Sequence, residues 1–216
     1  DGGVNWGRVL LTNYIDEWRS VSIASNGAGG WLGWMVGNVN GNRLWWTGTG
    51  NDWTPQSPGD RNNRSHEYSD VVVVGLSLAY AISNATTGAR IYSWDGTAWS
   101  PGPSTAALYD LDVLSPTQGA AVGKGGAVWR LAEGGTWSKM TPGPQTGGQD
   151  LYAVHYVADD QIWVAGARGK MFVWNGQAWT DRSPSGQIKA VRGIWLDASG
   201  GSGWAVGDDG LVLRYQ

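Results

Sequence analysis

Short stretches in which apolar and polar residues alternate recur along this chain, and glycine-rich turns separate them. This alternation has the period of a β-strand that buries one of its faces. Three such stretches lie at 108–113, 151–157 and 188–195, and looser versions fill the same slot at 18–24 and 71–76. The pattern predicts an all-β fold with a repeated first strand.

A second element follows each of these stretches. The sequence Trp-Ala-Val-Gly at 204–207 is matched well at 118–123 and 162–166, and more loosely at 33–37 and 78–83. Successive copies are about 40–46 residues apart, which is the repeat length of a propeller blade. One repeated position ends the element: Gly37, Ser83, Gly123, Gly166 and Gly207.

A third element completes each unit. It reads Trp-Asp-Gly-Thr-Ala-Trp at 94–99, Trp-Asn-Gly-Gln-Ala-Trp at 174–179 and Trp-Thr-Gly at 46–48. Asp-Gly and Asn-Gly pairs favour two-residue hairpin turns in which both central residues have positive φ. The element therefore predicts a hairpin that joins the third and fourth strands.

Four short strands in a unit of this length are typical of a β-propeller blade. We predict that residues 1–216 form one five-bladed β-propeller with four-stranded blades. The predicted blades are 12–57, 58–104, 105–146, 147–186 and 187–216. Residues 1–11 are predicted to supply the outer strand of the fifth blade and so to close the propeller.

The prediction of closure comes from the two ends of the chain. Residues 130–137 run Arg-Leu-Ala-Glu-Gly-Gly-Thr-Trp, and residues 214–216 followed by 1–6 give Arg-Tyr-Gln-Asp-Gly-Gly-Val-Asn-Trp. The two strings are nearly the same, so the N-terminal residues match the outer strand that the fifth unit lacks. Such a strand would cover the free edge of the last sheet.

The repeated tryptophans are predicted to pack one blade against the next, with backbone partners for their indole N–H groups. Tyr80 shares the position of the second-strand tryptophans. The residues at the two repeated positions are Trp34, Trp163 and Trp204 in the second strand, and Trp6, Trp53, Trp99, Trp137 and Trp179 in the fourth.

The repeat sequence resembles that of bacterial β-propeller repeat proteins of the sialidase-repeat and kelch-like type. It is also similar to photosystem II assembly-factor propellers. The resemblance covers the second to fifth units better than the first, and it implies an extracytoplasmic binding or assembly role. It transfers no catalytic residue, because Ser-Trp-Asp-Gly-Thr-Ala-Trp at 93–99 departs from the Asp-box spacing of sialidases.

Composition excludes several classes of function. Lys and Arg number 15 against 18 Asp and Glu, so no basic field favours nucleic acid as a partner. The chain has no cysteine, which excludes disulfides, thiolate metal sites and cysteine nucleophiles. The longest aliphatic run, at 71–74, is far too short to cross a bilayer.

Extra loop length is concentrated over the first two predicted blades. The connection at 54–69 and the inserts at 38–42 and 84–88 are long and polar, whereas the equivalent turns at 124–125 and 208–209 have two residues. Long loops on a rigid scaffold commonly carry binding residues, although they also occur as solvated decoration. The predicted ligand-binding residues are Trp31, Asn38, Asn40, Asn42, Arg61, Asn63, Arg64, His66 and Asn84.

Trp31 lies in a glycine-rich insert between the first and second strands of the first unit. Its ring is suited to stacking on a sugar or on a partner surface, or alternatively to capping the rim of the propeller.

Catalytic and metal-binding signals are weak. Asp70, Asp110 and Asp112 fall on or beside inner strands, where they could face a central channel, but no equivalent recurs in every unit. Neither His66 nor His155 has a companion at ligand spacing, and no nucleotide or cofactor motif is present. We predict a protein that is not an enzyme and that has no cofactor and no metal site.

Three functions remain open at this point. The first is lectin-like recognition of carbohydrate by loop aromatics and amides, in an extracellular or periplasmic binding propeller. The second is a protein partner, with the chain as an accessory subunit of a larger surface or membrane assembly. The third is a divergent glycoside hydrolase, which would need two carboxyl groups flanking the bond to be cut.

Overall fold

The computed structural model describes residues 17–38, 44–50, 52–56, 67–85 and 88–216. Within these ranges the chain forms β-strands and four short 3-10 helices. The strands lie in five antiparallel sheets that follow one another along the chain, and within each sheet the strands pair in sequence order.

The first sheet contains β1 (Glu17–Ser25), β2 (Trp31–Asn38), β3 (Leu44–Thr47) and β4 (Thr54–Gln56). The second contains β5 (Tyr68–Gly75), β6 (Leu78–Ser83), β7 (Ala89–Trp94) and β8 (Trp99–Thr105). The third contains β9 (Leu108–Ser115), β10 (Gln118–Gly123), β11 (Val128–Ala132) and β12 (Thr136–Lys139). The fourth contains β13 (Leu151–Ala158), β14 (Gln161–Gly166), β15 (Met171–Trp174) and β16 (Trp179–Asp181). The fifth contains β17 (Val191–Leu196), β18 (Gly203–Gly207) and β19 (Leu211–Tyr215).

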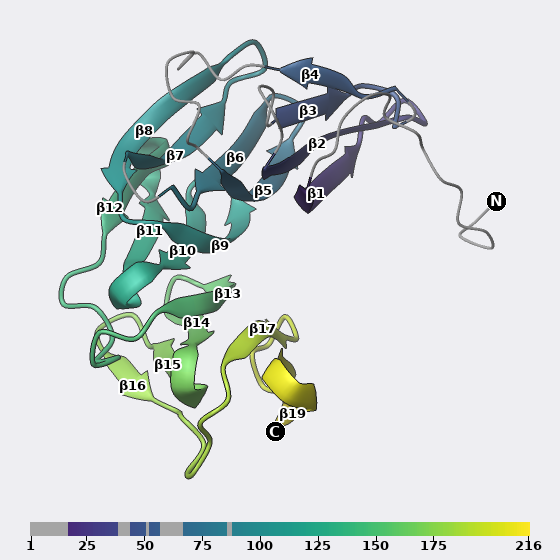
Figure 1. Ribbon diagram of the computed structural model, residues 1–216. Helices are drawn as coiled ribbons and strands as arrows, with labels where there is room; N and C mark the ends of the chain where they lie inside the picture. The colour runs from purple at the N-terminus through teal and green to yellow at the C-terminus, as the bar shows by residue number, and fades with distance from the viewer. Residues whose placement is uncertain (1–16, 39–43, 51, 57–66, 86–87) are drawn as a thin grey trace.

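The five sheets stand side by side along an arc (Figure 1). The first strands of the sheets, β1, β5, β9, β13 and β17, line its concave side, and consecutive first strands contact each other. The first and fifth sheets lie at the two ends of the arc, which is open between them. This is the radial arrangement of a β-propeller. The predicted closing strand, residues 1–11, lies outside the described residues.

A β-bulge interrupts each first strand near its start, after one ladder pair in β5, β9, β13 and β17 and after two in β1. In β9, Leu108 pairs with Gly123 and Asp110 pairs with Val122, so Tyr109 has no opposing residue. The equivalent residues in the other four first strands are skipped in the same way: Arg19, Ser69, Tyr152 and Arg192.

Close approach of the backbone explains the repeated glycine opposite this bulge. A Cβ added at Gly123 would overlap the carbonyl oxygen of Ala107, which accepts a 2.9 Å hydrogen bond from the N–H of Lys124. The φ angle of Gly123 is −175°, an extended conformation, so space for the carbonyl, not a positive φ, requires the glycine. The same overlap would occur between Gly37 and Glu17, between Gly166 and Asp150, and between Gly207 and Ala190.

The core consists of layers between neighbouring sheets. Three positions on each sheet face the following sheet, two on its second strand and one on its third. In the first four sheets these side chains are buried against the next sheet or its edge: Trp34, Val36 and Leu44; Tyr80, Ile82 and Ile91; Ala120, Val122 and Val128; Trp163, Ala165 and Met171. One set of positions therefore builds all four interfaces.

At the two ends of the arc the same positions are exposed. In the fifth sheet the equivalent residues, Trp204, Val206 and Val212, are 50%, 49% and 60% exposed. In the first sheet Val21 and Ile23, which lie where the following sheets bury their inner-strand residues, are also exposed. The prediction that all the repeated tryptophans are buried between sheets is therefore wrong for Trp204, because no described sheet follows the fifth.

Trp34, Trp99 and Trp137 pack between sheets as predicted, while Trp6 lies outside the described residues. Trp34 meets Trp99 edge to face, with ring centroids 4.8 Å apart, and Tyr80 meets Trp137 at 5.5 Å. The buried indole N–H groups of Trp99, Trp137, Trp163 and Trp179 have no hydrogen-bond partner among the described residues. The prediction of backbone partners is therefore wrong for these four tryptophans.

Two turns differ from the sequence prediction. In the Asp-Gly turn only Gly96 has a positive φ, and Asp95 accepts hydrogen bonds from the N–H groups of Thr97 and Ala98 at 2.8 and 2.9 Å. The carboxylate, and not a pair of positive φ angles, holds this turn. The turns after β10, β14 and β18 are three-residue 3-10 helices, η1 (Lys124–Gly126), η3 (Ala167–Gly169) and η4 (Asp208–Gly210), not two-residue turns.

Replacing the repeated glycine is expected to destabilise the fold. Gly123→Ala would place a Cβ against a backbone carbonyl and should lower the free energy of unfolding by about 1–3 kcal/mol. Urea denaturation at neutral pH measures this change. Gly75→Ala is the matched control, because its added Cβ meets no atom within 4 Å. Equal effects of the two substitutions would contradict the steric explanation.

Candidate functional site

The five bulge residues lie around one cavity at the start of the first strands. The cavity has a volume of about 510 Å³, and we call it the inner-rim cavity. Its lining comes from all five sheets: Arg19, Ser69, Asn84, Tyr109, Asp150, Tyr152 and Arg192.

The bulges determine which side chains enter this cavity. A bulged residue has no partner in the ladder, so its side chain is turned out of the ordinary alternation between the two faces of the sheet. Because a bulge occurs at the same position in the first strand of each of the five sheets, it brings five side chains together. The site is therefore a product of the repeat, while its chemistry varies from sheet to sheet.

On the third to fifth sheets the lining is an aromatic and cationic stack. The rings of Tyr109 and Tyr152 are 5.5 Å apart, and the guanidinium carbon of Arg192 lies 4.1 Å from the centroid of the Tyr152 ring. Arg192 also forms a two-point contact with Asp208, at 2.9 Å from Nε and 3.2 Å from Nη2. Asp208 raises the pKa of Arg192, so the side chain stays charged. These contacts hold three flat groups in fixed orientations.

Tyr109 is also fixed by its hydroxyl group. It donates a hydrogen bond of 3.3 Å to Asp150 Oδ2, while Asp150 Oδ1 accepts the N–H of Gly125 at 2.8 Å. Burial, together with the charge of Asp150, raises the pKa of Tyr109 to about 12. The phenol is therefore a hydrogen-bond donor at neutral pH.

The opposite side of the cavity carries Arg19 and Asn84. Arg19 Nη2 lies 3.4 Å from Glu67 Oε2 and 3.5 Å from Glu17 Oε2. Asn84 donates its backbone N–H to the carbonyl of Glu67 at 2.9 Å, while its side-chain Oδ1 is buried without a partner among the described residues. This side offers a guanidinium group and an amide.

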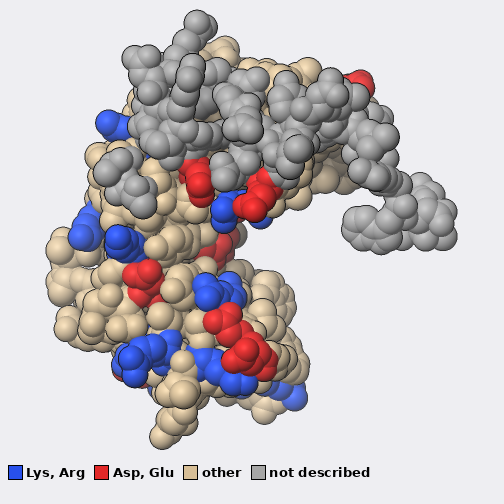
Figure 2. All heavy atoms as spheres, viewed as in Figure 1, with Lys and Arg blue, Asp and Glu red and all other residues tan. Residues whose placement is uncertain are grey.

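Acidic and basic side chains alternate around the cavity, so the site has no strong field of one sign. Figure 2 shows Lys and Arg interspersed with Asp and Glu over the face in view. A ligand would therefore be recognised by aligned hydrogen bonds and stacking, and not by net charge.

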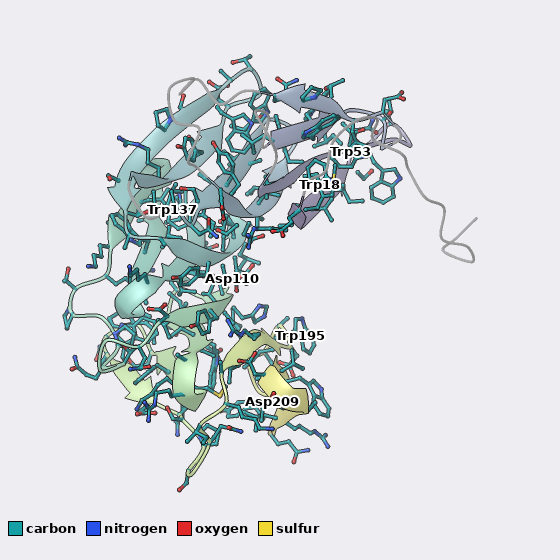
Figure 3. The ribbon with its side chains drawn as sticks, in the orientation of Figure 1. Trp18, Trp53, Asp110, Trp137, Trp195 and Asp209 are labelled. Atoms are coloured by element: carbon teal, nitrogen blue, oxygen red, sulfur yellow. The ribbon has the colours of Figure 1, made fainter. Side chains whose placement is uncertain are left out.

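Next to the bulges, the carboxyl groups of Asp70 and Asp110 connect three sheets. Asp70 Oδ2 accepts the N–H of Leu111 at 3.0 Å, and Asp110 Oδ2 accepts the N–H of Val154 at 2.7 Å. Asp110 lies on the concave side of the arc (Figure 3). Each carboxyl group therefore satisfies a backbone donor on the first strand of the following sheet.

Asp70 and Asp110 also interact with each other, and their raised pKa values favour a proton shared between them. Burial raises both pKa values, and the neighbouring charge of Asp70 contributes to raising the pKa of Asp110 to about 8. Two adjacent carboxyl groups in such surroundings cannot both ionise easily. Since their oxygens are engaged with backbone N–H groups, the pair is explained by a structural role.

Asp112 and His155 repeat the arrangement one step along the strands. Asp112 Oδ2 accepts the N–H of Tyr156 at 2.8 Å and lies 3.0 Å from His155 Nδ1, while His155 Nε2 lies 3.0 Å from the carbonyl oxygen of Leu196. Both ring nitrogens face acceptors, and the hydrogen bond to Asp112 is the main cause of the raised pKa of His155. The ring joins the third, fourth and fifth sheets.

Two of the predicted ligand residues, Asn84 and Trp31, are fully described, and they lie far apart in the structure. Asn84 lines the inner-rim cavity. Trp31 is 50% exposed at the start of β2, opposite Ser25, which is the far end of the first sheet from Arg19. Asn38 ends β2 opposite Glu17. The other predicted ligand residues lie outside the described residues and stay predictions: Asn40, Asn42, Arg61, Asn63, Arg64 and His66.

Sequence reasoning missed Arg19, Ser69, Tyr109, Tyr152 and Arg192. All but Ser69, which falls in the predicted connection at 54–69, lie within stretches that the pattern predicts as strands, where alternation assigns them to one face of the sheet. A signal was present, because each of the five immediately precedes the alternating core of its strand at the same point of the repeat. The alternation of apolar and polar residues within one strand does not reveal a bulge. Only an alignment of the five repeats could have grouped the bulge residues.

No group of His, Asp and Glu that could hold a metal ion occurs in the described ranges. In the same ranges no helix is both long enough and apolar enough to cross a membrane.

The geometry defines a β-propeller with a polar and aromatic cavity on its inner rim. Comparison with known proteins supports the propeller fold. No protein-family model matches the chain. In sequence it is 26% identical over 132 residues to the photosystem II assembly lipoprotein Ycf48 of Synechocystis sp.. The match covers 54% of this chain and 38% of the relative, so the chain spans well under half of that protein.

Solved structures show the same fold. YCF48 from Cyanidioschyzon merolae superposes with a TM-score of 0.66 at 17% identity, over 92% of this chain and 66% of that one. YCF48 bound to D1 peptide superposes with a TM-score of 0.51 at 18% identity, over 100% of this chain and 84% of that one. A streptogramin B lyase superposes with a TM-score of 0.66 at 10% identity, over 94% of this chain and 72% of that one. An assembly factor and a lyase share the architecture, so the fold alone does not define the activity.

The Asp70–Asp110 pair predicts a pH-dependent stability. Both pKa values are raised on folding, so the folded state holds more protons than the unfolded state above about pH 4. The free energy of unfolding should therefore fall as the pH rises, until the pair has ionised at about pH 8.

Asp110→Asn tests this prediction, since the amide can still accept the N–H of Val154 but carries no charge. Urea denaturation at pH 5 and pH 9 should show a smaller loss of stability in this variant than in the wild type. Asp110→Ala, the control, should be less stable at both pH values because it leaves that N–H without a partner. An unchanged pH dependence in Asp110→Asn would contradict the shared proton.

Proposed function

We propose that this chain is an accessory propeller that binds an extended segment of a partner protein at the inner-rim cavity. The observation that carries the proposal is the cavity itself, where Tyr109, Tyr152 and Arg192 present flat faces and donors from three successive sheets. Tyr and Arg are the residues most enriched in protein-binding hot spots.

The relatives support the choice of a protein ligand. One similar structure is described as bound to D1 peptide, and the relative in sequence is described as a photosystem II assembly lipoprotein. We propose the corresponding role here, with the five sheets as five blades and a location on the extracytoplasmic side of a membrane. The alternation of charge around the cavity suits a peptide backbone, whose amides donate and accept in turn.

Two earlier alternatives receive less support. Carbohydrate binding was predicted from Trp31 and the loop amides, but Trp31 and Asn84 lie at opposite ends of their sheets, and the relatives supply no support for a sugar ligand. For a hydrolase, the adjacent carboxyl groups of Asp70 and Asp110 are engaged with backbone N–H groups, so they do not flank an open substrate site.

A peptide-binding measurement tests the proposal. Calorimetric titration of the purified chain with D1 peptide should give a specific complex, and Tyr152→Ala should weaken it about tenfold or more because it removes the middle ring of the stack. Trp31→Ala is the matched control, since it removes an exposed aromatic ring at the other end of the sheets.

The outcomes separate the candidate sites. A loss of affinity in Tyr152→Ala alone, with an unchanged melting temperature, supports the inner-rim cavity. A loss in Trp31→Ala alone moves the site to the opposite end of the first sheet. Absence of any peptide binding, together with sugar binding that Trp31→Ala abolishes, would overturn the proposal in favour of the lectin hypothesis.

A further inference from the structure

We propose that His155 is a positioning residue for the inner-rim cavity: while its ring is protonated, it holds β17 against β13 and so keeps Arg192 stacked on Tyr152. The inference rests on the function proposed above in one respect, since it makes the affinity for a peptide depend on pH. The placement of β17 can be measured without any peptide, so the two claims can fail separately.

His155 lies in the middle of β13 and contacts two other sheets. Its Nδ1 lies 3.0 Å from Asp112 Oδ2 on β9, and its Nε2 lies 3.0 Å from the carbonyl oxygen of Leu196 on β17. Both partners are acceptors, so the imidazolium can donate to both at once. A neutral ring carries one N–H and can donate to one of them, which leaves a lone pair facing the other acceptor. The protonated ring is therefore the form that fits this site.

The layer between the fourth and fifth sheets has little apolar surface to bury. The other three layers each contain buried aromatic side chains. The buried members of this layer are small or unbranched by comparison: Ala153, Ala165, Met171, Val191 and Ala205. Because less apolar area is buried, hydrogen bonds between the two sheets carry a larger share of the attachment. His155 faces the carbonyl of Leu196 across this interface, and Gln161 Nε2 donates to the carbonyl of Gly200 at 3.1 Å.

The same two first strands meet again at the inner-rim cavity. Tyr152 precedes His155 on β13, and Arg192 precedes Leu196 on β17. The guanidinium carbon of Arg192 is 4.1 Å from the centroid of the Tyr152 ring. A strand advances about 3.3 Å per residue, so the two contacts are roughly 10–13 Å apart along the strands. When the contact at His155 is lost, β17 is released near its end, and Arg192 is held less firmly on Tyr152.

The groups that face the ring determine the pH at which it loses its proton. Asp112 is in direct contact, and Asp110 acts from the same strand. From β17 the ring meets a carbonyl and the ring of Trp195, with 6.4 Å between the ring centroids, and from β14 the opposing residue is Trp163. Trp195 and Asp110 lie on the concave side of the arc (Figure 3). The hydrogen bond to Asp112 is the main cause of the raised pKa of His155.

Raising the pH should weaken the hold of His155 on β17. A histidine in an unfolded chain has a pKa of about 6.5. The contribution of the ring is complete below that pH and is lost as the pH rises through the higher pKa of the folded state. Asp70 and Asp110 lose stability in the same direction, since the pKa of Asp110 is raised to about 8. The experiment therefore has to separate the ring from this carboxyl pair.

Hydrogen exchange of residues 188–197 measures the placement of β17 without peptide. Carbon-13 NMR of histidine-labelled protein first gives the midpoint of the His155 titration. The chain has two histidines, so the signal that disappears in His155→Gln identifies the residue. Exchange is then measured by mass spectrometry about one pH unit below and above the midpoint, where the ring is mostly charged and mostly neutral. Protection factors correct for the intrinsic pH dependence of exchange.

Wild-type β17 should be at least about threefold more protected below the midpoint than above it. His155→Gln, which keeps a donor but cannot change its charge, should show equal protection at both pH values. Asp110→Asn removes the titration of the carboxyl pair and should retain the wild-type difference around its own midpoint. Gln161→Ala, the matched control, removes the other bond across the interface and should lower protection equally at both pH values.

These variants decide the positioning role. Equal protection of wild-type β17 at both pH values would overturn it. So would a difference that persists in His155→Gln or disappears in Asp110→Asn, because the carboxyl pair would then be its source. Should His155→Gln fail to fold, the wild type and Asp110→Asn still give the answer.

Calorimetric titration with D1 peptide at the same two pH values tests the consequence for the cavity. The dissociation constant of the wild type should rise at least about threefold above the midpoint, and that of His155→Gln should not change. A constant wild-type affinity while β17 loses protection would overturn the link between His155 and the cavity. Absence of binding at both pH values would contradict the proposed function, while the exchange measurement would still decide the role of His155.

Discussion

A close contact between a glycine and a backbone carbonyl, at the start of the first strand in four of the five sheets, is the constraint that sets how these strands meet their neighbours. At Gly123 the carbonyl of Ala107 comes so near that no side chain fits. This carbonyl accepts a hydrogen bond from the N–H of Lys124, and the first strand bulges two residues later, at Tyr109. The bulge takes Tyr109 out of the ladder and makes it part of the cavity wall.

Neighbouring sheets share no ladder, so side chains must satisfy the backbone donors between them. Ser22 accepts the N–H of Val73 at 2.9 Å, and Asp70, Asp110 and Asp112 do the same further along the arc. These bonds fix the height of each first strand relative to the next. The apolar layers on the outer side of the bonds then supply most of the burial, and the polar row on the concave side supplies the register between sheets.

The sequence was informative about the strands and much less so about the site. Glycines and tryptophans at a fixed spacing predicted the sheets, because each sheet repeats the same requirements. The glycine makes room for a backbone carbonyl, and the tryptophan packs on the neighbouring sheet. The lining residues could not be predicted in this way, since Arg19, Ser69 and Tyr109 share a position but no chemistry. Asn84 was found from loop length, and it lies beside them because the turn after β6 ends at the same rim. Trp31 was predicted to lie in a glycine-rich insert, but it begins β2. Asn26 closes the short loop before it through its side-chain oxygen, which accepts the N–H groups of Ala28 and Gly30 at 2.9 Å.

The five bulged positions have a consequence for protein engineering. A residue outside the ladder can be exchanged without altering strand pairing, so the five bulged positions offer adjustable sites on one rigid frame. Tyr109, Tyr152 and Arg192 contact one another and would have to be exchanged together. Combinatorial libraries restricted to these codons would sample new recognition surfaces at small expense in foldability. The same arrangement would allow the recognition surface of a propeller to change while its strand pairing stays the same.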